Sequence, residues 1–107
     1  MYEPDLAPGT EFQLMRRSLD FAYMRRQVAA LESRLDGRTP FFALYIDCTG
    51  RAGAVSGTAQ EDAVEIQATV GARVPLLGVY SGLEIARVGG APQALQWTGV
   101  LCLFSAA

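Results

Sequence analysis

The 107-residue sequence contains no histidine and no lysine, and all nine of its basic residues are arginines. Without histidine, Ser-His and Cys-His nucleophile pairs are impossible, and so are the usual zinc and iron sites. Without lysine, Schiff-base chemistry and a Walker-type phosphate-binding loop are excluded as well. These absences lead us to expect a protein that is not an enzyme and that holds no metal or other cofactor.

The sequence also has little of what directs a protein to nucleic acid, to a membrane or out of the cell. Its formal net charge is −2 with no basic tract, so we do not expect a nucleic-acid partner. The longest apolar stretch, residues 40–46, is far shorter than the ~20 residues that a membrane span needs. No basic segment followed by an apolar one opens the chain as a secretory signal would. We therefore expect a cytoplasmic protein without a membrane partner.

Cysteine is scarce too. Cys48 and Cys102 fall in apolar surroundings, are too few for a disulfide scaffold and form no C-x-x-C pair. Buried, reduced thiols are the expected state of both side chains.

The length suffices for one domain and is too short for two. Residues 1–10 carry Pro4, Pro8 and Gly9 without any period, which predicts a tail or linker before a single domain over residues 11–107. Residues 11–16 roughly alternate between polar and apolar, as a half-buried strand does.

Two helices are predicted from apolar residues at spacings of three and four. The first runs near residues 18–36, with Ser18 as its cap and Gly37 at its end. The second runs near residues 58–71, where Thr58 and Glu61 have the spacing of a capping box.

Further strands are predicted at residues 75–80, 83–88 and 97–104, in addition to 40–47. The continuous apolar run at 40–46 is typical of a central strand covered on both faces, so Ile46→Asp should prevent folding. The predicted fold class is α/β, with α+β as the alternative. We expect a single mixed sheet of about four to five strands with two helices, in the order β-α-β-α-β-β.

Two strand–helix–strand units in this order predict parallel strands, because such crossovers are nearly always right-handed and usually join parallel strands. The ends of the first three strands, with Arg16 and Arg17 after the first, would then meet at one edge of the sheet, beside the amino ends of both helices. Ligands of open α/β sheets tend to bind in this crevice. The candidate ligand-binding residues at this edge are Asp47, Cys48, Thr49, Gly50, Arg51, Tyr80, Ser81, Glu84 and Thr98.

Two of these residues have alternative roles. The fork of Arg51 can hold a carboxylate or phosphate of a ligand, or it can pair with Asp47 or Glu84 and shape the loop. Glu84 can bind a ligand ammonium group, or it can fix its own loop by a hydrogen bond. Opposite charges beside free amides suit a small polar or anionic ligand such as an amino acid.

Three segments together resemble a known family. Residues 45–51 read YIDCTGR and resemble the strand followed by "C-x-G-R" of the FIST C-terminal domain. Residues 75–86 read PLLGVYSGLEIA and resemble its "P-x-x-G-x-Y…E-I" segment, although Leu83 stands where many members have glycine. Residues 97–101, WTGVL, lie where the family has a Thr and a closing strand. The resemblance runs from about Glu11 to Phe104.

This resemblance implies a sensory domain of signal-transduction proteins that binds small ligands. The alternative is an interaction or structural module that docks a partner signalling domain and has no small ligand. A closed pocket at Arg51, Ser81 and Glu84 favours the first function. A flat surface there, with an exposed apolar patch elsewhere, favours the second.

Overall fold

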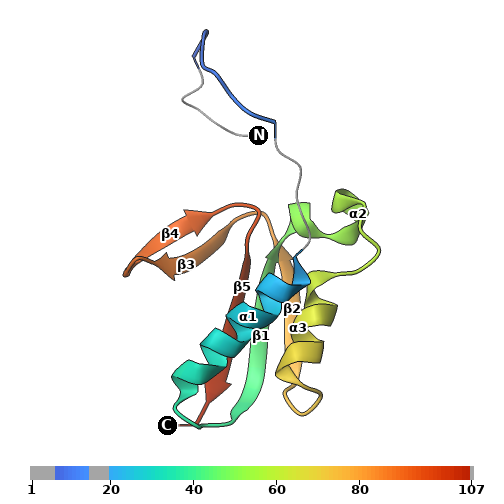
Figure 1. Ribbon diagram of the computed structural model, residues 1–107, viewed down its shortest axis with the longest axis vertical. Coiled ribbons are helices and arrows are strands. Elements are labelled where there is room, and N and C mark those ends of the chain that lie inside the picture. The colour runs from blue at the N-terminus through green and yellow to red at the C-terminus, as the bar shows by residue number, and fades with distance from the viewer. Residues whose placement is uncertain (1–6, 15–19, 107) are drawn as a thin grey trace.

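The structure is a computed structural model that describes residues 7–14 and 20–106 of the chain. The α/β class predicted from the sequence is confirmed (Figure 1). The elements are α1 (Phe21–Glu32), η1 (Ser33–Leu35), β1 (Pro40–Cys48), η2 (Thr49–Arg51), α2 (Gly53–Ser56), α3 (Asp62–Val70), β2 (Leu76–Ser81), β3 (Glu84–Val88), β4 (Ala91–Leu95) and β5 (Gly99–Ser105).

The strands form two sheets instead of the single sheet predicted. β1 lies in the middle of a three-stranded sheet, parallel to β2 and antiparallel to β5. β3 and β4 form a separate antiparallel ribbon that projects from the body of the molecule (Figure 1). Gly89 and Gly90 both have positive φ, and this two-residue turn lets β3 pair with β4 directly after it.

The strand predicted at residues 11–16 is not formed where the structure describes it. Residues 11–14 are exposed and have no strand partner, and residues 15 and 16 lie outside the described residues. Alternation alone does not make a strand, because a strand also needs a neighbour that satisfies its backbone groups. The described part of the chain therefore has one parallel crossover, from β1 through α3 to β2.

The cap of helix α1 lies two residues after the predicted one. The carboxylate of Asp20 accepts a hydrogen bond from the Tyr23 amide at 2.9 Å, which makes Asp20 the cap; Ser18 lies outside the described residues. The helix continues through η1 and ends where Asp36 and Gly37 turn left-handed, as the glycine predicted.

Helix α3 begins at Asp62, and the predicted capping box at Thr58 and Glu61 does not form. The Glu61 carboxylate instead accepts the backbone amide of Gly53 at 2.9 and 3.1 Å. A Cβ at Gly53 would lie 2.6 Å from the Thr58 carbonyl oxygen, so only glycine allows this approach. The competing contact with Gly53 draws Glu61 away from the Thr58 amide, and the helix starts one turn late.

Both long helices pack on one face of the three-stranded sheet (Figure 1). Ala43 and Tyr45 of β1 are buried there against Val28 of α1 and Ile66 and Val70 of α3. We call this the covered face. Burial of these side chains supplies the hydrophobic stabilisation of the domain.

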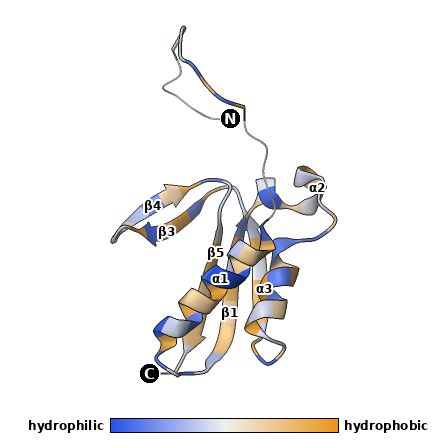
Figure 2. Ribbon diagram, in the orientation of Figure 1, coloured by the Kyte–Doolittle hydropathy of each residue, from blue (hydrophilic) through white to orange (hydrophobic). Residues whose placement is uncertain are grey.

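The opposite side of the same sheet has no helix over it within the described residues. Cross-strand partners share a face, so the register of β1 with β2 and β5 fixes which side chains lie there. We call it the open face, and it carries Phe42, Leu44, Ile46, Leu77, Val79, Val100, Cys102 and Phe104. β1 is hydrophobic over much of its length (Figure 2), yet only one of its faces is covered. The described residues therefore do not supply the cover that was predicted for the second face, and Ile46 is only half-buried.

Candidate functional site

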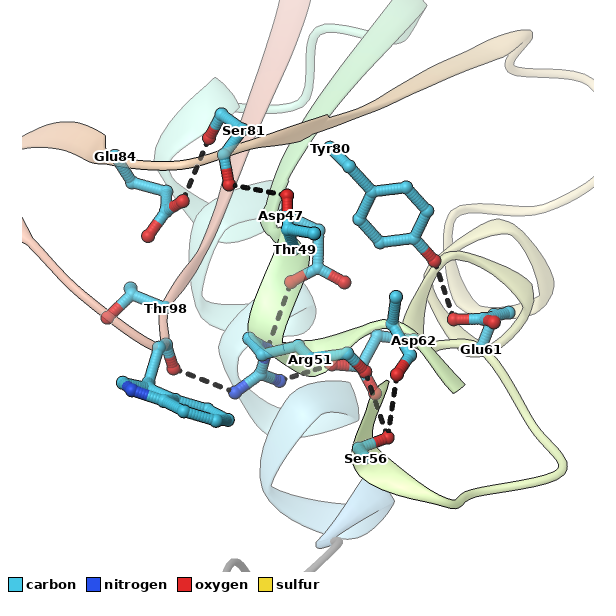
Figure 3. A network of polar contacts seen from close by, with 12 residues as sticks. Asp47, Thr49, Arg51, Ser56, Glu61, Asp62, Tyr80, Ser81, Glu84 and Thr98 are labelled. Atoms are coloured by element: carbon cyan, nitrogen blue, oxygen red, sulfur yellow. Dashed lines mark hydrogen bonds and ion pairs between the residues drawn. The ribbon is translucent and has the colours of Figure 1, made fainter. Parts of the chain in front are cut away.

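Arg51 is the centre of a polar network at the end of β1 (Figure 3). The 3-10 turn η2 folds the chain back, so that the Arg51 Nε donates to Asp47 Oδ1 at 2.9 Å, four residues earlier. Its Nη2 donates to Asp62 Oδ2, and its Nη1 donates to the Trp97 carbonyl oxygen at 3.1 Å. Each of the three guanidinium nitrogens thus has a partner within the domain. This arrangement favours the structural role of Arg51, because a ligand carboxylate would have to displace one of these contacts.

The carboxylates that hold Arg51 are almost completely buried. Asp47 is 3% exposed and Asp62 is 1% exposed. Burial raises the pKa of Asp47 above its ordinary value, although the charge of Arg51 opposes that shift. Burial, followed by the neighbouring charge of Asp47, also raises the pKa of the Tyr45 hydroxyl. The network is an ion-pair cluster with two buried carboxylates and a partly exposed arginine, whose members depend on one another.

Sequence reasoning missed Asp62 as a partner of Arg51. An acidic residue in the first turn of a helix is common, because it faces the positive end of the helix dipole. Nothing in its local pattern distinguishes a buried ion-pair partner from an ordinary solvent-exposed first-turn acid. The pairing depends on the crossover that brings the start of α3 to the end of β1, so it is a product of the tertiary fold.

The segments that follow β1 and β2 contact each other, as we predicted from the parallel arrangement of these strands. The Thr49 hydroxyl donates to the Ser81 carbonyl oxygen at 3.0 Å, and the Ser81 hydroxyl donates to Glu84 Oε1 at 2.8 Å (Figure 3). Glu84 is 1% exposed, and its Oε2 is buried with no hydrogen-bond partner among the described residues. The bond to Ser81 fits the loop-fixing role for Glu84.

The remaining predicted site residues surround the same network. The Cys48 amide donates to the Thr98 carbonyl oxygen at 3.2 Å, and its thiol is free and buried. Gly50 lies against the ring of Trp97. The half-exposed Tyr80 donates its hydroxyl to Glu61 Oε2 at 2.5 Å, and this hydrogen bond, with burial second, raises its pKa to about 12. Arg16 and Arg17, which were expected at this edge, lie outside the described residues.

A groove of about 630 Å³ begins beside Arg51 and runs between α1, the ribbon and β5. Its volume is within the range of about 300–1,000 Å³ that small-molecule sites occupy. Apolar side chains of all three walls line it: Met24 and Leu31 from α1, Val88 and Leu95 from the ribbon, and Leu101 from β5.

Polar groups border this groove as well. Asp20, Arg34, Arg51, Arg87 and Thr98 all contribute to its lining. Arg51 is held by its two carboxylates, and Asp20 caps α1 and pairs with Arg26 at 3.6 Å. Arg34 and Arg87 are the exposed arginines of the lining, and the Nε of Arg87 donates to the Gly90 carbonyl oxygen at 2.9 Å. Ser81 and Glu84 do not line the groove, so it is not the closed pocket predicted at Arg51, Ser81 and Glu84.

A smaller hollow of about 100 Å³ lies beside Asp47 and Tyr80, between β2 and α3. It is several-fold smaller than small-molecule sites usually are, so its volume suits a few water molecules at most. The groove is therefore the better candidate for a ligand site.

The described residues form neither a membrane-spanning helix nor a metal-ligand cluster. None of their helices combines the length and the apolarity that crossing a bilayer demands. Nor do they bring three or more Cys, Asp or Glu side chains together in a cluster that could ligate a metal ion.

Comparison with protein-family models matches residues 1–87 to the FIST C domain. The matched region contains β1, the Arg51 network and β2 with the Ser81–Glu84 segment, and it ends within β3. The segment 97–101 that also resembles the family lies beyond it. Neither a curated protein nor a solved structure matches the chain.

Proposed function

Since the chain belongs to the FIST C domain family of signal-transduction sensory domains, we propose that it senses a small molecule, which binds in the groove between α1 and the β3–β4 ribbon. The groove itself is the observation that carries this proposal. It is large enough for a small molecule, it is lined by apolar side chains from three elements, and charged groups lie at its border. The Arg51 network supports one end of it through the Trp97 carbonyl oxygen.

The lining favours a ligand with an apolar body and a carboxylate. Met24, Leu31 and Leu101 offer the apolar contacts, and burying an aliphatic or aromatic group there is worth about 25 cal/mol for each Å² removed from water. Arg34 and Arg87 supply guanidinium forks that match a carboxylate. The ligand predicted from the sequence was a small polar or anionic compound such as an amino acid; the groove favours those members of that class that have an apolar side chain.

A thermal-shift series tests this proposal with phenylacetate, hexanoate, hexylamine, acetate and leucine as probes. Phenylacetate and hexanoate should raise the melting temperature, because ligands that bind only the folded state stabilise it by mass action. Acetate lacks the apolar body and hexylamine has the wrong charge, so both should have much weaker effects. A melting temperature that responds to none of the probes, or equally to hexylamine and hexanoate, would contradict the proposed ligand class.

Matched variants locate the site. Val88→Asp adds a negative charge to the groove at a residue that is 44% exposed, and it should abolish the shift caused by hexanoate. Ile85→Asp is the control, since Ile85 belongs to the same strand, is 65% exposed and lies outside the groove lining. Equal responses of the two variants to hexanoate would place the binding elsewhere.

Arg34→Gln tests the cationic border separately. Arg34 is exposed, so its replacement should change the free energy of unfolding by less than about 0.5 kcal/mol while weakening the response to carboxylates. Arg73→Gln, an exposed arginine outside the groove, should leave that response unchanged.

A further inference from the structure

Trp97 has an unusual backbone conformation for a bulky residue. Its φ is 57°, in the left-handed region that residues with large side chains rarely adopt. Hydrogen bonds hold the backbone around it, because the carbonyl oxygens of residues 96, 97 and 98 all have donors. They accept from the Thr98 hydroxyl at 2.9 Å, from Arg51 Nη1 at 3.1 Å and from the Cys48 amide at 3.2 Å. Strained residues persist only where their surroundings enforce them, and they cluster at functional sites.

The ring of Trp97 lies flat on the backbone of Gly50. A Cβ at Gly50 would lie 3.0, 3.0 and 3.2 Å from Cη2, Cζ3 and Cε3, which are adjacent atoms of the six-membered ring. Nearly equal distances to three adjacent ring atoms mean that Gly50 faces the flat side of the ring and not its edge. Carbon atoms in contact normally lie about 3.5–4.0 Å apart, so a side chain at position 50 would push the ring away. The glycine therefore gives the ring a flat support.

The opposite side of the ring is left to the groove. Trp97 is 58% exposed and belongs to the groove lining. A tryptophan that stabilises a fold by burial is largely buried, which this one is not. The left-handed position alone would be filled at lower cost by glycine or asparagine. An exposed tryptophan at this place is instead explained by an aromatic surface that is presented to an occupant of the groove.

The charges of the lining decide which group this surface receives. The face of an indole ring attracts either a cation or a second aromatic ring. Arg34 and Arg87 are exposed in the same lining, whereas its acidic residue, Asp20, is paired with Arg26. Two exposed arginines repel a cationic ligand. An uncharged aromatic ring is therefore the group that suits both the indole and its surroundings.

We propose that Trp97 determines the specificity of the groove, and that the ligands are planar aromatic carboxylates whose ring stacks on the indole. The proposal rests on the proposed function, because it selects among the carboxylates that have an apolar body. A stacked aromatic pair is favoured beyond the area that it buries, while an aliphatic ring of the same size gains from burial alone. The groove should thus prefer an aromatic ring even to a more hydrophobic aliphatic one.

Isothermal titration calorimetry with phenylacetate and cyclohexylacetate tests this preference. The two carboxylates have the same number of carbon atoms, but the phenyl ring is flat and the cyclohexyl ring is puckered and more hydrophobic. The unmodified protein should bind phenylacetate with a dissociation constant at least about threefold lower than that of cyclohexylacetate. Equal constants, or tighter binding of cyclohexylacetate, would overturn the role of Trp97 and leave the proposed function standing. Binding of neither carboxylate would end both.

Trp97→Asn shows whether the preference comes from the indole. Asparagine tolerates the left-handed conformation, so this variant should remain folded by circular dichroism. It should bind cyclohexylacetate at least as tightly as phenylacetate. Trp97→Phe retains a ring and should retain the preference for phenylacetate. An unfolded Trp97→Asn protein would mean that the ring serves the fold, and an unchanged preference in this variant would place the stacking elsewhere; either result contradicts the proposal.

Tyr23→Leu is the matched control. Tyr23 is the other half-exposed aromatic residue of the described lining, at 54%. The Arg26 guanidinium lies 6.0 Å from the centre of the Tyr23 ring, so one face of this ring already has a partner. Tyr23→Leu should therefore retain the preference for phenylacetate, whatever it does to the affinity for both carboxylates. A preference that is lost in Tyr23→Leu and kept in Trp97→Asn would assign the recognition to Tyr23 and refute the role of Trp97.

Discussion

The two faces of one three-stranded sheet have opposite environments. On the covered face, Ala43 and Tyr45 are 0% and 3% exposed and pack against two helices. On the open face, Leu77 and Val79 are about half exposed although they are just as apolar. The same strands supply both sets of residues. The difference teaches that the apolarity of a strand does not by itself reveal which of its two faces the described helices cover.

The largest expected effect is on the covered side, at Arg51. Arg51→Ala should lower the free energy of unfolding by about 3–5 kcal/mol, because it leaves Asp47 and Asp62 as buried carboxylates without their cation. Urea denaturation measures the loss. Adding Asp62→Asn to this variant removes one of the stranded charges and should recover part of the stability. A loss below about 1 kcal/mol would mean that water screens the network as it screens a surface ion pair.

A close approach on the covered face gives the next largest effect. A Cβ at Gly99 would lie 2.1 Å from the Tyr45 hydroxyl oxygen, so Gly99→Ala must displace a buried ring and should cost about 1–3 kcal/mol. Gly78→Ala is the control on the same face, since its Cβ would meet Ala63 at an ordinary 3.9 Å. Thermal melts of the two variants should differ by several degrees. Equal melting temperatures would show that Tyr45 moves easily and that the core is loosely packed.

Valine truncations compare the two faces directly. Val28→Ala removes two buried methyl groups and should cost about 1–2 kcal/mol, because Val28 is 2% exposed in the core. Val79→Ala removes the same atoms from the open face and should cost less than about 0.5 kcal/mol, because Val79 is 43% exposed. Denaturation at low protein concentration measures both. Equal costs would erase the distinction between the faces.

The smallest effect on the free energy of unfolding at neutral pH is expected from the ionisation of Tyr45, which matters only at high pH. Burial raises its pKa above the ordinary value of 10.0, so the folded state keeps a proton that the unfolded chain loses. The unfolded state then binds fewer protons, and the free energy of unfolding should fall as the pH rises above about 10. Tyr45→Phe should make this fall shallower than it is in Tyr23→Phe, a variant of an exposed tyrosine. Identical slopes for the two variants would show that Tyr45 titrates like an exposed side chain.

Sequence patterns within a short segment were sufficient to predict the positions of one helix and three strands. The three- and four-residue spacing located α1, and apolar runs located β1, β2 and β5 to within about two residues. The strand proposed at residues 11–16 failed over its described part because a strand depends on a distant partner. The capping box failed for a similar reason, since Gly53 lies eight residues before Glu61 and competes for its carboxylate.

The site was less predictable than the fold. The edge that gathers Thr49, Ser81 and Arg51 followed from a parallel crossover, and that crossover is present. The groove was not predicted, because one of its walls is a ribbon that leaves the central sheet. The predicted ligand role of Arg51 rested on its residue type, while the tertiary contacts with Asp62 and the Trp97 carbonyl decide how its nitrogens are used.

Trp97 has one more consequence. It is the only tryptophan of the chain, its ring lies on Gly50 and lines the groove, and its carbonyl oxygen accepts from Arg51. Its side chain is 58% exposed, so its fluorescence emission should respond to any molecule that displaces water from this end of the groove. The same emission should report the opening of the ion-pair network when the protein unfolds. The domain thus contains its own optical probe, placed at the junction of the groove and the Arg51 network, and both can be followed without a label.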